Sequence, residues 1–223
     1  NPAHRDRLAF MRICSGRFTR GMSVYHSRLG KEIKLAQPQQ FMAQERNIIE
    51  EAYPGDIIGL FDPGIFNIGD TLSEGNNQLK YEGIPIFPAE HFARVMASDS
   101  MKRKQFVKGI EQLSEEGAIQ VFKQPDSGAE TLIIGAVGVL QFEVLEHRLK
   151  HEYGVDLRIQ QLSYKLARWI EDEAIDPKKL NLTSSTMIVE DKLGRKVLLF
   201  ENDWSVRWAE EKNNNLGLLE IAK

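Results

Sequence analysis

One short segment of the sequence comes close to the phosphate-binding loop of nucleotide-hydrolysing enzymes. Residues 16–23 read GRFTRGMS, against a motif of G-x4-G-K-[ST] whose lysine holds the β and γ phosphates. Met22 stands in place of that lysine, and the alternating residues after it predict a strand where the motif requires a helix. The D-x-x-G matches at 56–59 and 191–194 have no N-K-x-D partner. The chain is therefore predicted neither to bind GTP tightly nor to hydrolyse it.

Three other residues have the spacing of metal ligands on a helix. Glu143, His147 and His151 recur every four residues, which places them on one face of a helix. The apolar residues of the same segment fall on the opposite face, at Phe142, Leu145, Leu149 and Tyr153. The histidines are therefore expected to face solvent, with no fourth ligand within reach and no metal site.

The only cysteine of the chain, Cys14, lies in an apolar segment without a nearby histidine. It cannot form an intramolecular disulfide, which suits a reducing compartment, and it is predicted to be a small buried residue rather than a nucleophile. No catalytic constellation emerges from the residues, which indicate a two-domain binding or scaffold protein.

Cations are concentrated near the start of the chain, although the formal net charge is -3. Residues 1–34 hold eight Lys or Arg and two Asp or Glu, a bias that favours a polyanion-facing surface or, alternatively, solvated strand edges. Arg17 and Arg20 flank Phe18 in a predicted turn and are candidate contacts with the phosphates of RNA. They could instead solvate the turn or bridge to acidic neighbours.

A second cationic group opens a predicted helix. Asp99 or Ser100 is suited to cap a helix that ends near Glu116, and its first turn carries Lys102, Arg103 and Lys104. These three residues are further candidate contacts with RNA. The alternative is an ordinary solvated face, because acidic residues follow on the same helix.

Composition excludes several classes of protein. The 42% hydrophobic and 27% charged residues are typical of a globular chain rather than a disordered one. The apolar runs are much shorter than the roughly 18 residues that a membrane helix needs, and the first residues lack the apolar region of a signal peptide.

The elements that must position these residues fall into two groups. Before residue 80, short strands recur about every 8–12 residues, which favours a small β-barrel or a sandwich, and the residues at 75–77 read as a linker. After it, the pattern predicts the order β-α-β-β-α-β of a ferredoxin-like α+β domain, with helices over 100–116 and 139–153. Its expected core, under one face of a four-stranded antiparallel sheet, contains Phe106, Ile110, Leu113, Phe142, Leu145 and Leu149.

The segment after about residue 163 is predicted to be a C-terminal extension of this domain. A strand is expected over 164–170, a hairpin over 187–200, and a short helix that Asn202 caps and that runs to Lys212. The domains are therefore expected at 1–80 and 81–223.

Longer strings of residues resemble the bacterial peptide chain release factor 3 family of translational GTPases. Strings similar to its second domain are CSGRFTRGM at 14–22, QER at 44–46, EEAYPGDI at 50–57 and IGDTL at 68–72. Strings similar to its third domain are KQF at 104–106, QLSEEGA at 112–118, GAVGVLQF at 135–142 and ARW at 167–169. The elongation factor G type shares the architecture but lacks these strings.

The resemblance implies a translation-factor β-barrel followed by an α/β domain, in a cytoplasmic protein that uses GTP on the ribosome to eject class I release factors. The GTPase domain of that family has no counterpart here, so GTP and magnesium would belong to the parent protein, and the barrel is expected to start after its first strand. The implied partners are ribosomal RNA and proteins, with no membrane, and the chain is expected to be a monomer.

A small ferredoxin-like enzyme with an accessory barrel is the alternative from another functional class. Association with ribosomes, set beside a survey for catalytic turnover, distinguishes the two hypotheses.

Overall fold

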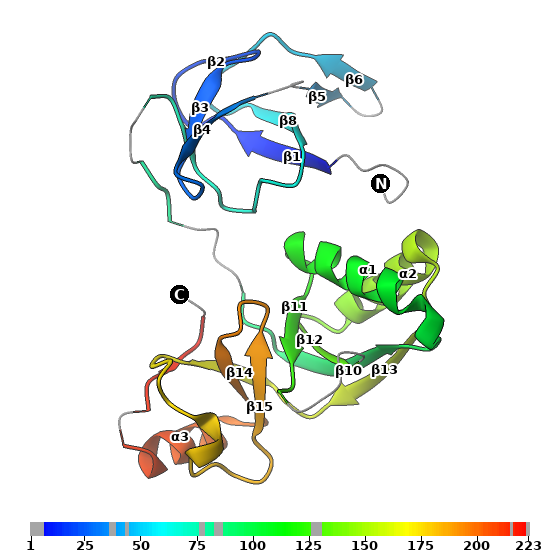
Figure 1. Ribbon diagram of the computed structural model, residues 1–223, viewed down its shortest axis with the longest axis vertical. Helices are drawn as coiled ribbons and strands as arrows, with labels where there is room; N and C mark the ends of the chain where they lie inside the picture. Colours follow the sequence, from blue (N-terminus) through cyan, green and yellow to red (C-terminus); the bar gives the residue numbers. More distant parts are fainter. Residues whose placement is uncertain are drawn as a thin grey trace. The chain divides into compact units, whose positions relative to one another are not determined.

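The computed structural model divides the chain into two compact units, Asn1–Ile84 and Pro85–Lys223. It describes residues 7–35, 39–42, 45–75, 79–82, 87–125, 131–214 and 216–221, and Figure 1 labels the helices and strands. Asn76 and Asn77 of the predicted linker lie outside the described residues. Each unit has its own hydrophobic core.

The first unit consists of short antiparallel strands in three small sheets. The sheet β1-β8-β5-β6 contains Arg7–Arg12, Ile57–Asp62, Gln39–Met42 and Glu45–Ile48, in that order. The sheet β4-β3-β9 contains Lys31–Lys34, Ser23–His26 and Leu72–Ser73, and β2 (Phe18–Thr19) pairs with β7 (Glu51–Ala52). All three sheets contribute to one core, formed by Ile13, Phe18, Val24, Leu35, Ala52, Ile58 and Leu60.

The prediction that Cys14 is buried was wrong. β1 ends at Arg12, and Ile13 then points into the core with 7% of its surface exposed. Ile13 is held there by two backbone hydrogen bonds, because its N–H donates to Asp56 O at 2.9 Å and its carbonyl accepts from Gly55 N at 2.8 Å. Successive side chains of extended backbone point to opposite faces, so Cys14 is exposed.

The second unit contains one eight-stranded antiparallel sheet and the three α-helices of the described chain. Its elements in chain order are β10 (His91–Ala97), η1 (Ser100–Lys102), α1 (Arg103–Glu115), β11 (Gln120–Lys123), β12 (Leu132–Ala136), α2 (Leu140–Tyr153), β13 (Leu157–Leu162), β14 (Leu166–Ile170), η2 (Pro177–Lys179), β15 (Met187–Asp191), β16 (Lys196–Phe200), α3 (Asp203–Lys212) and β17 (Leu218–Leu219). The order of the strands across the sheet is β13-β10-β12-β11-β15-β16-β14-β17.

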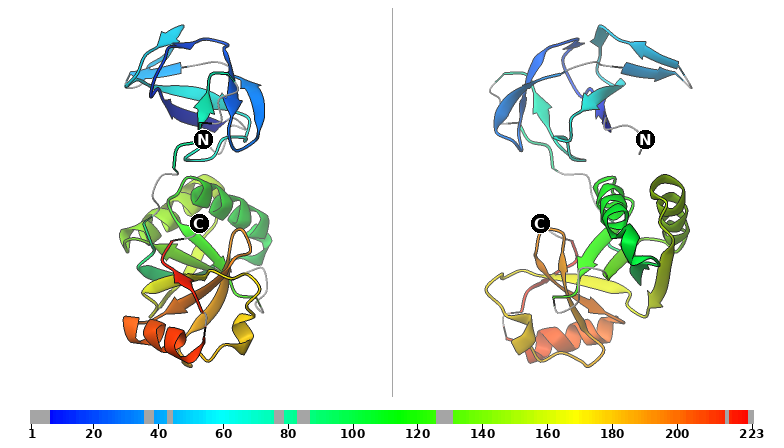
Figure 2. Two further views of the ribbon diagram at one scale, coloured as in Figure 1. Left: turned by 90° about the vertical axis from the view of Figure 1, so that its left-hand side faces the viewer. Right: turned by 45° about the vertical axis from the view of Figure 1, so that its right-hand side comes forward.

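The predicted β-α-β-β-α-β order is present as β10-α1-β11-β12-α2-β13. Helices α1 and α2 lie side by side against one face of these four strands (Figure 2). The six residues predicted to share a core do so, together with Ala93, Val95 and Ile134 of the sheet. The predictions for both helices and their common face are therefore confirmed.

Local signals explain where the helices begin and end. Asp99 caps the turn before α1, because its Oδ1 accepts a hydrogen bond from Met101 N at 2.9 Å. α2 ends at Gly154, whose φ of 65° is a left-handed conformation that favours glycine. Asn202 caps α3, as predicted, by accepting a hydrogen bond from Ser205 N at 3.0 Å.

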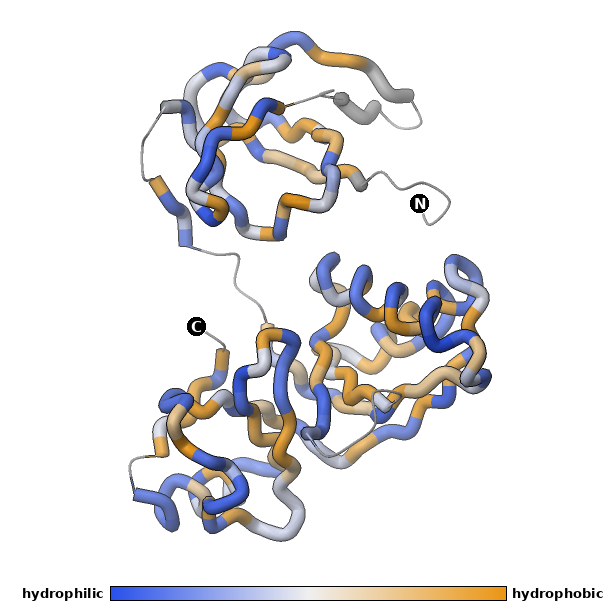
Figure 3. Tube along the Cα trace, viewed as in Figure 1, coloured by the Kyte–Doolittle hydropathy of each residue, from blue (hydrophilic) through white to orange (hydrophobic). Residues whose placement is uncertain are grey.

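The prediction of a four-stranded sheet was incomplete, because the segment after residue 163 adds four further strands to it. β15 pairs with β11 and thereby continues the sheet, with Asp191 opposite Phe122. Hydrophobic residues recur along the strands of both halves of this sheet (Figure 3). A second core gathers Phe92, Phe122 and Ile133 from the first half with Ala167, Trp169, Val189, Val197 and Leu199 from the second.

This second core shows that the sheet curls. Phe92 and Ile133 point away from α1 and α2, because their neighbours Ala93 and Ile134 belong to the core under those helices. In the second half, Leu198 points away from the shared core and packs with α3. The two halves of the sheet therefore face one another across Phe122, with α1 and α2 on one outer side and α3 on the other.

Replacing Gly109 with alanine is expected to destabilise the second unit by about 1–2 kcal/mol. A Cβ on Gly109 would overlap Leu149 Cδ2 and lie 3.1 Å from Tyr153 Cγ. Overpacking costs about 1–3 kcal/mol, and the overlap with Leu149 places this substitution in the upper part of that range, at about 2–3 kcal/mol. The better helix propensity of alanine offsets about 1 kcal/mol of this cost. Urea unfolding measures the difference, with exposed Gln105→Ala on the same helix as the control. A Gly109→Ala variant as stable as that control would contradict the close packing of α1 on α2.

Candidate nucleic-acid interface

The candidate RNA contacts of the second unit lie where η1 passes into α1. Lys102 is half-buried, whereas Arg103 and Lys104 are exposed. Asp99 fixes the backbone of this turn through Met101, so the three cations extend from a defined helix start. The apolar side of α1, with Phe106 fully buried, anchors the helix on the sheet.

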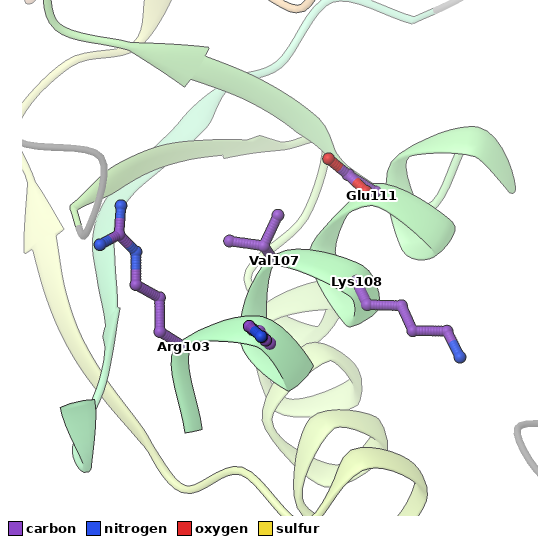
Figure 4. Close-up of a pocket in the computed structure, with 5 residues that line it drawn as sticks. Arg103, Val107, Lys108 and Glu111 are labelled. Carbon is purple, nitrogen blue, oxygen red and sulfur yellow. The ribbon is translucent and has the colours of Figure 1, made fainter. Parts of the chain in front are cut away.

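A shallow hollow follows the outer face of α1. Its volume is about 410 Å³, and it is lined by Arg103, Lys104, Val107, Lys108 and Glu111. Arg103 and Lys108 extend to opposite sides of Val107 (Figure 4). Three cations and one carboxylate give this face a local formal charge of +2, and we refer to these five residues as the α1 cationic face.

Two lysines of the α1 cationic face form no close ion pair with a described residue. Among the residues that the structure describes, neither Lys104 nor Lys108 has a carboxylate oxygen within 4.0 Å. Lys108 shares this face because it lies one helical turn after Lys104. Lys108 was not among the contacts predicted from the sequence, where the acidic residues of the same helix left an ordinary solvated face as the alternative.

The two candidate arginines of the first unit each lie beside an acidic residue. Arg20 Nη1 is 2.8 Å from Glu50 Oε1, and Arg17 Nη1 is 3.6 Å from Glu51 Oε1. The pairing of β2 with β7 brings these residues together across about thirty positions of sequence. All four side chains are exposed, and exposed ion pairs contribute only about 0–1 kcal/mol, so both guanidinium groups can exchange their partners.

The structure gives other roles to the motifs that resemble nucleotide-binding sequences. Phe18 is 3% exposed and belongs to the core of the first unit, and β3 follows the segment 16–23 where a phosphate-binding loop would have a helix. The D-x-x-G match at 191–194 is the turn of the β15–β16 hairpin. Asp191 Oδ1 accepts hydrogen bonds there from Leu193 N at 2.9 Å and Arg195 N at 3.0 Å.

The predicted solvent exposure of His147 and His151 is confirmed. Among the described residues, no three His, Cys, Asp or Glu side chains form a group that could hold a metal ion.

Within the same part of the chain, no helix combines the length and the apolar character needed to cross a bilayer.

Two protein-family models match the chain, one in each unit. Residues 1–75 match "Elongation factor G domain 2", and residues 81–210 match "Class II release factor RF3, C-terminal domain". Neither of these models is a GTPase domain.

Curated relatives carry the same name over nearly the whole chain. A peptide chain release factor 3 of Symbiobacterium thermophilum is 59% identical over 97% of this chain and 40% of its own length. The relative from Listeria welshimeri is 49% identical over 99% of this chain and 42% of its own length. The relative from Gloeothece citriformis is 47% identical over 100% of this chain and 41% of its own length. The chain thus spans about 40% of the length of these relatives.

A solved structure is similar in fold alone. A crystal structure of a Thermus thermophilus protein has a TM-score of 0.57 and 16% sequence identity, and the match covers 82% of this chain and 28% of that protein.

Proposed function

Because the chain belongs to the class II release factor RF3 family, we propose that it is the ribosome-binding part of a translation-termination GTPase. In this proposal the whole protein uses GTP to promote the release of class I release factors from the ribosome. The domains matched here supply binding surface and no catalysis. We further propose that the protein works in the cytoplasm as a monomer.

The observation that carries this proposal is the α1 cationic face. Lysine and arginine bind nucleic acids chiefly through the phosphates, which gives affinity with little sequence information. Such contacts suit docking on a fixed RNA surface. Arg103, Lys104 and Lys108 project from one rigid helix, so their charges can be matched to a defined arrangement of phosphates.

We rank Arg17 and Arg20 below the α1 cationic face as RNA contacts. Each arginine has an acidic neighbour. If the arginine binds an RNA phosphate in place of that carboxylate, the freed carboxylate stays close to the RNA and repels it. Lys102 and Arg103 remain candidates together with Lys104, and Lys108 joins them as a residue that the structure adds.

The strand order β13-β10-β12-β11 supports assigning residues 91–162 to the ferredoxin-like class, with the curled half of the sheet as its C-terminal extension. We place the domain boundary near residue 80. The division into compact units at Ile84 and Pro85 supports that position.

The chain is expected to sediment with ribosomes, and the variant Arg103→Ala/Lys104→Ala/Lys108→Ala is expected to bind with a weaker salt dependence. Each lost phosphate contact should flatten the slope of log K against log salt by roughly 0.7–0.9, which gives a total of roughly 2.1–2.7 for three contacts. Alanine keeps the helix propensity of α1. Sedimentation across a salt series measures the slope.

The matched control removes two exposed lysines elsewhere in the second unit, as Lys178→Ala/Lys179→Ala. Its slope should equal that of the unchanged chain. An unchanged slope in the α1 variant would rule out the α1 cationic face as the contact, and a chain that does not sediment with ribosomes would overturn the proposed function itself. Arg17→Ala/Arg20→Ala, measured alongside, tests the lower-ranked candidates.

A further inference from the structure

The outer face of α2 carries two imidazole rings that the proposed RNA contacts do not use. His147 and His151 are both exposed, and their ring centroids are 4.3 Å apart with an interplanar angle of 41°. They lie one helical turn apart near the C-terminal end of a helix of 14 residues. The buried residues Phe142, Leu145 and Leu149 fix this helix against the sheet, so the two ring positions belong to a rigid backbone.

Although the sequence pattern predicted no metal site here, we propose that His147 and His151 form a bidentate site for a divalent transition-metal ion of the Zn²⁺, Ni²⁺ and Cu²⁺ class. Neutral imidazole nitrogen is a preferred ligand of these ions. Histidines four residues apart on one helix supply two such nitrogens to a single ion, as in the zinc-binding H-E-x-x-H helix. The ring centroids are close enough for one nitrogen of each imidazole to reach a common ion after side-chain rotation.

The neighbouring cations are held in ion pairs, which limits their repulsion of a metal ion. Lys150 Nζ lies 3.1 Å from Asp156 Oδ1, and Arg148 Nε lies 2.7 Å from Glu152 Oε1. Arg148 is also paired with Glu116. The carboxylates of these pairs therefore offset the positive charges on either side of the two histidines.

The ligand set determines which ions bind. Glu143, the third residue of the sequence pattern, does not join the histidines, because the described residues contain no group of three potential ligands. The remaining coordination positions are left to water. Two nitrogens without a carboxylate select against Mg²⁺ and Ca²⁺, which require oxygen ligands, and the general order of affinities predicts tighter binding of Cu²⁺ than of Ni²⁺ or Zn²⁺.

Calorimetric titration with NiCl₂, ZnCl₂ and CuCl₂ tests the site in a His4→Ala/His91→Ala background. That background removes the other histidines except the fully buried His26. One ion per chain is expected to bind. Adding either His147→Ala or His151→Ala should weaken its affinity at least tenfold, because a chelate becomes a single-ligand contact. Adding Glu143→Gln should change the affinity less than twofold, and MgCl₂ should give no binding heat.

Thermal unfolding provides a second measurement. An ion that binds only the folded chain raises the midpoint temperature as its concentration rises, so NiCl₂ should raise this temperature in the background variant and raise it clearly less after His151→Ala. If either histidine replacement weakens binding by twofold or less, the rings act separately and the chelate is refuted. Loss of all binding in the His4→Ala/His91→Ala background would place the metal elsewhere and likewise refute it.

Discussion

Replacing Phe122 with alanine is expected to lower the free energy of unfolding of the second unit by about 3–5 kcal/mol. Phe122 is 1% exposed and lies at the centre of the core that joins the two halves of the curled sheet. Its ring centroid is 6.0 Å from that of Phe92 and 6.1 Å from that of Trp169. Removing the ring leaves a cavity and also eliminates both aromatic contacts.

Urea unfolding monitored by tryptophan fluorescence, which comes from Trp169, Trp204 and Trp208, and by circular dichroism measures this loss. The two signals should shift together, since β11 and β14 depend on the same core. Phe87→Ala is the control, because the side chain of Phe87 is 73% exposed and its removal should change stability by no more than about 0.5 kcal/mol. Separate transitions for the two halves of the sheet, or a loss near that of the control, would contradict a shared core.

Periodicity identified most elements of the second unit because each helix or strand there has a pronounced apolar pattern. The stripe of Phe106, Ile110 and Leu113 predicted α1 and its buried face, and the structure confirms both. Capping chemistry predicted the start of α3 at Asn202. These signals are local, since they need only residues within one or two helical turns.

The curled sheet could not be predicted in the same way. Whether β15 pairs with β11 depends on residues about 70 positions apart, Phe122 and Asp191, and no local pattern encodes that choice. In the first unit, successive side chains point to opposite faces, so that Ile13 is buried and Cys14 is exposed. A continuous apolar run does not show where a strand ends, so the prediction for Cys14 was wrong.

In the candidate interface, too, contacts between residues far apart in the sequence could not be predicted from local patterns. The sequence predicts that Arg17 and Arg20 lie in a turn, whereas the acids that accompany them come from β7 and the residue before it. Their proximity follows from strand pairing rather than from sequence spacing. The α1 cationic face was within reach of the sequence, because residues 103, 104, 107, 108 and 111 lie on one helix and their relative positions follow from the helical repeat.

Asp191 is the centre of a buried polar group at the β15–β16 hairpin. Its side chain accepts hydrogen bonds from Trp169 Nε1 at 3.0 Å and from Arg195 Nε at 2.7 Å, in addition to the two backbone N–H groups of the turn. Burial by itself would raise the pKa of Asp191. The hydrogen bonds from Trp169 and Arg195 outweigh burial and hold the pKa below its usual value of 3.8.

Replacing Asp191 with alanine is expected to cost about 3 kcal/mol at neutral pH. The substitution leaves the buried indole N–H of Trp169 without Asp191 as its acceptor, which costs about 1–3 kcal/mol, and it removes a carboxylate that pairs with the partly buried guanidinium of Arg195. Asp156→Ala is the matched control. Its carboxylate is exposed and paired with exposed Lys150, so its removal should cost no more than about 1 kcal/mol.

The cost of Asp191→Ala should also depend on pH, and the sign follows from the lowered pKa. A carboxyl group whose pKa is lower in the folded chain than in the unfolded chain binds its proton more weakly when folded. Its contribution to stability is therefore complete above the unfolded pKa and is lost as the pH falls through the folded pKa. Urea unfolding of both proteins from pH 7 to pH 2.5 should show a constant difference down to about pH 5, near the upper limit of titration for an unfolded Asp, and a shrinking difference below it. A difference that stays constant throughout, or grows in acid, would mean that Asp191 does not owe its stabilising role to its charge.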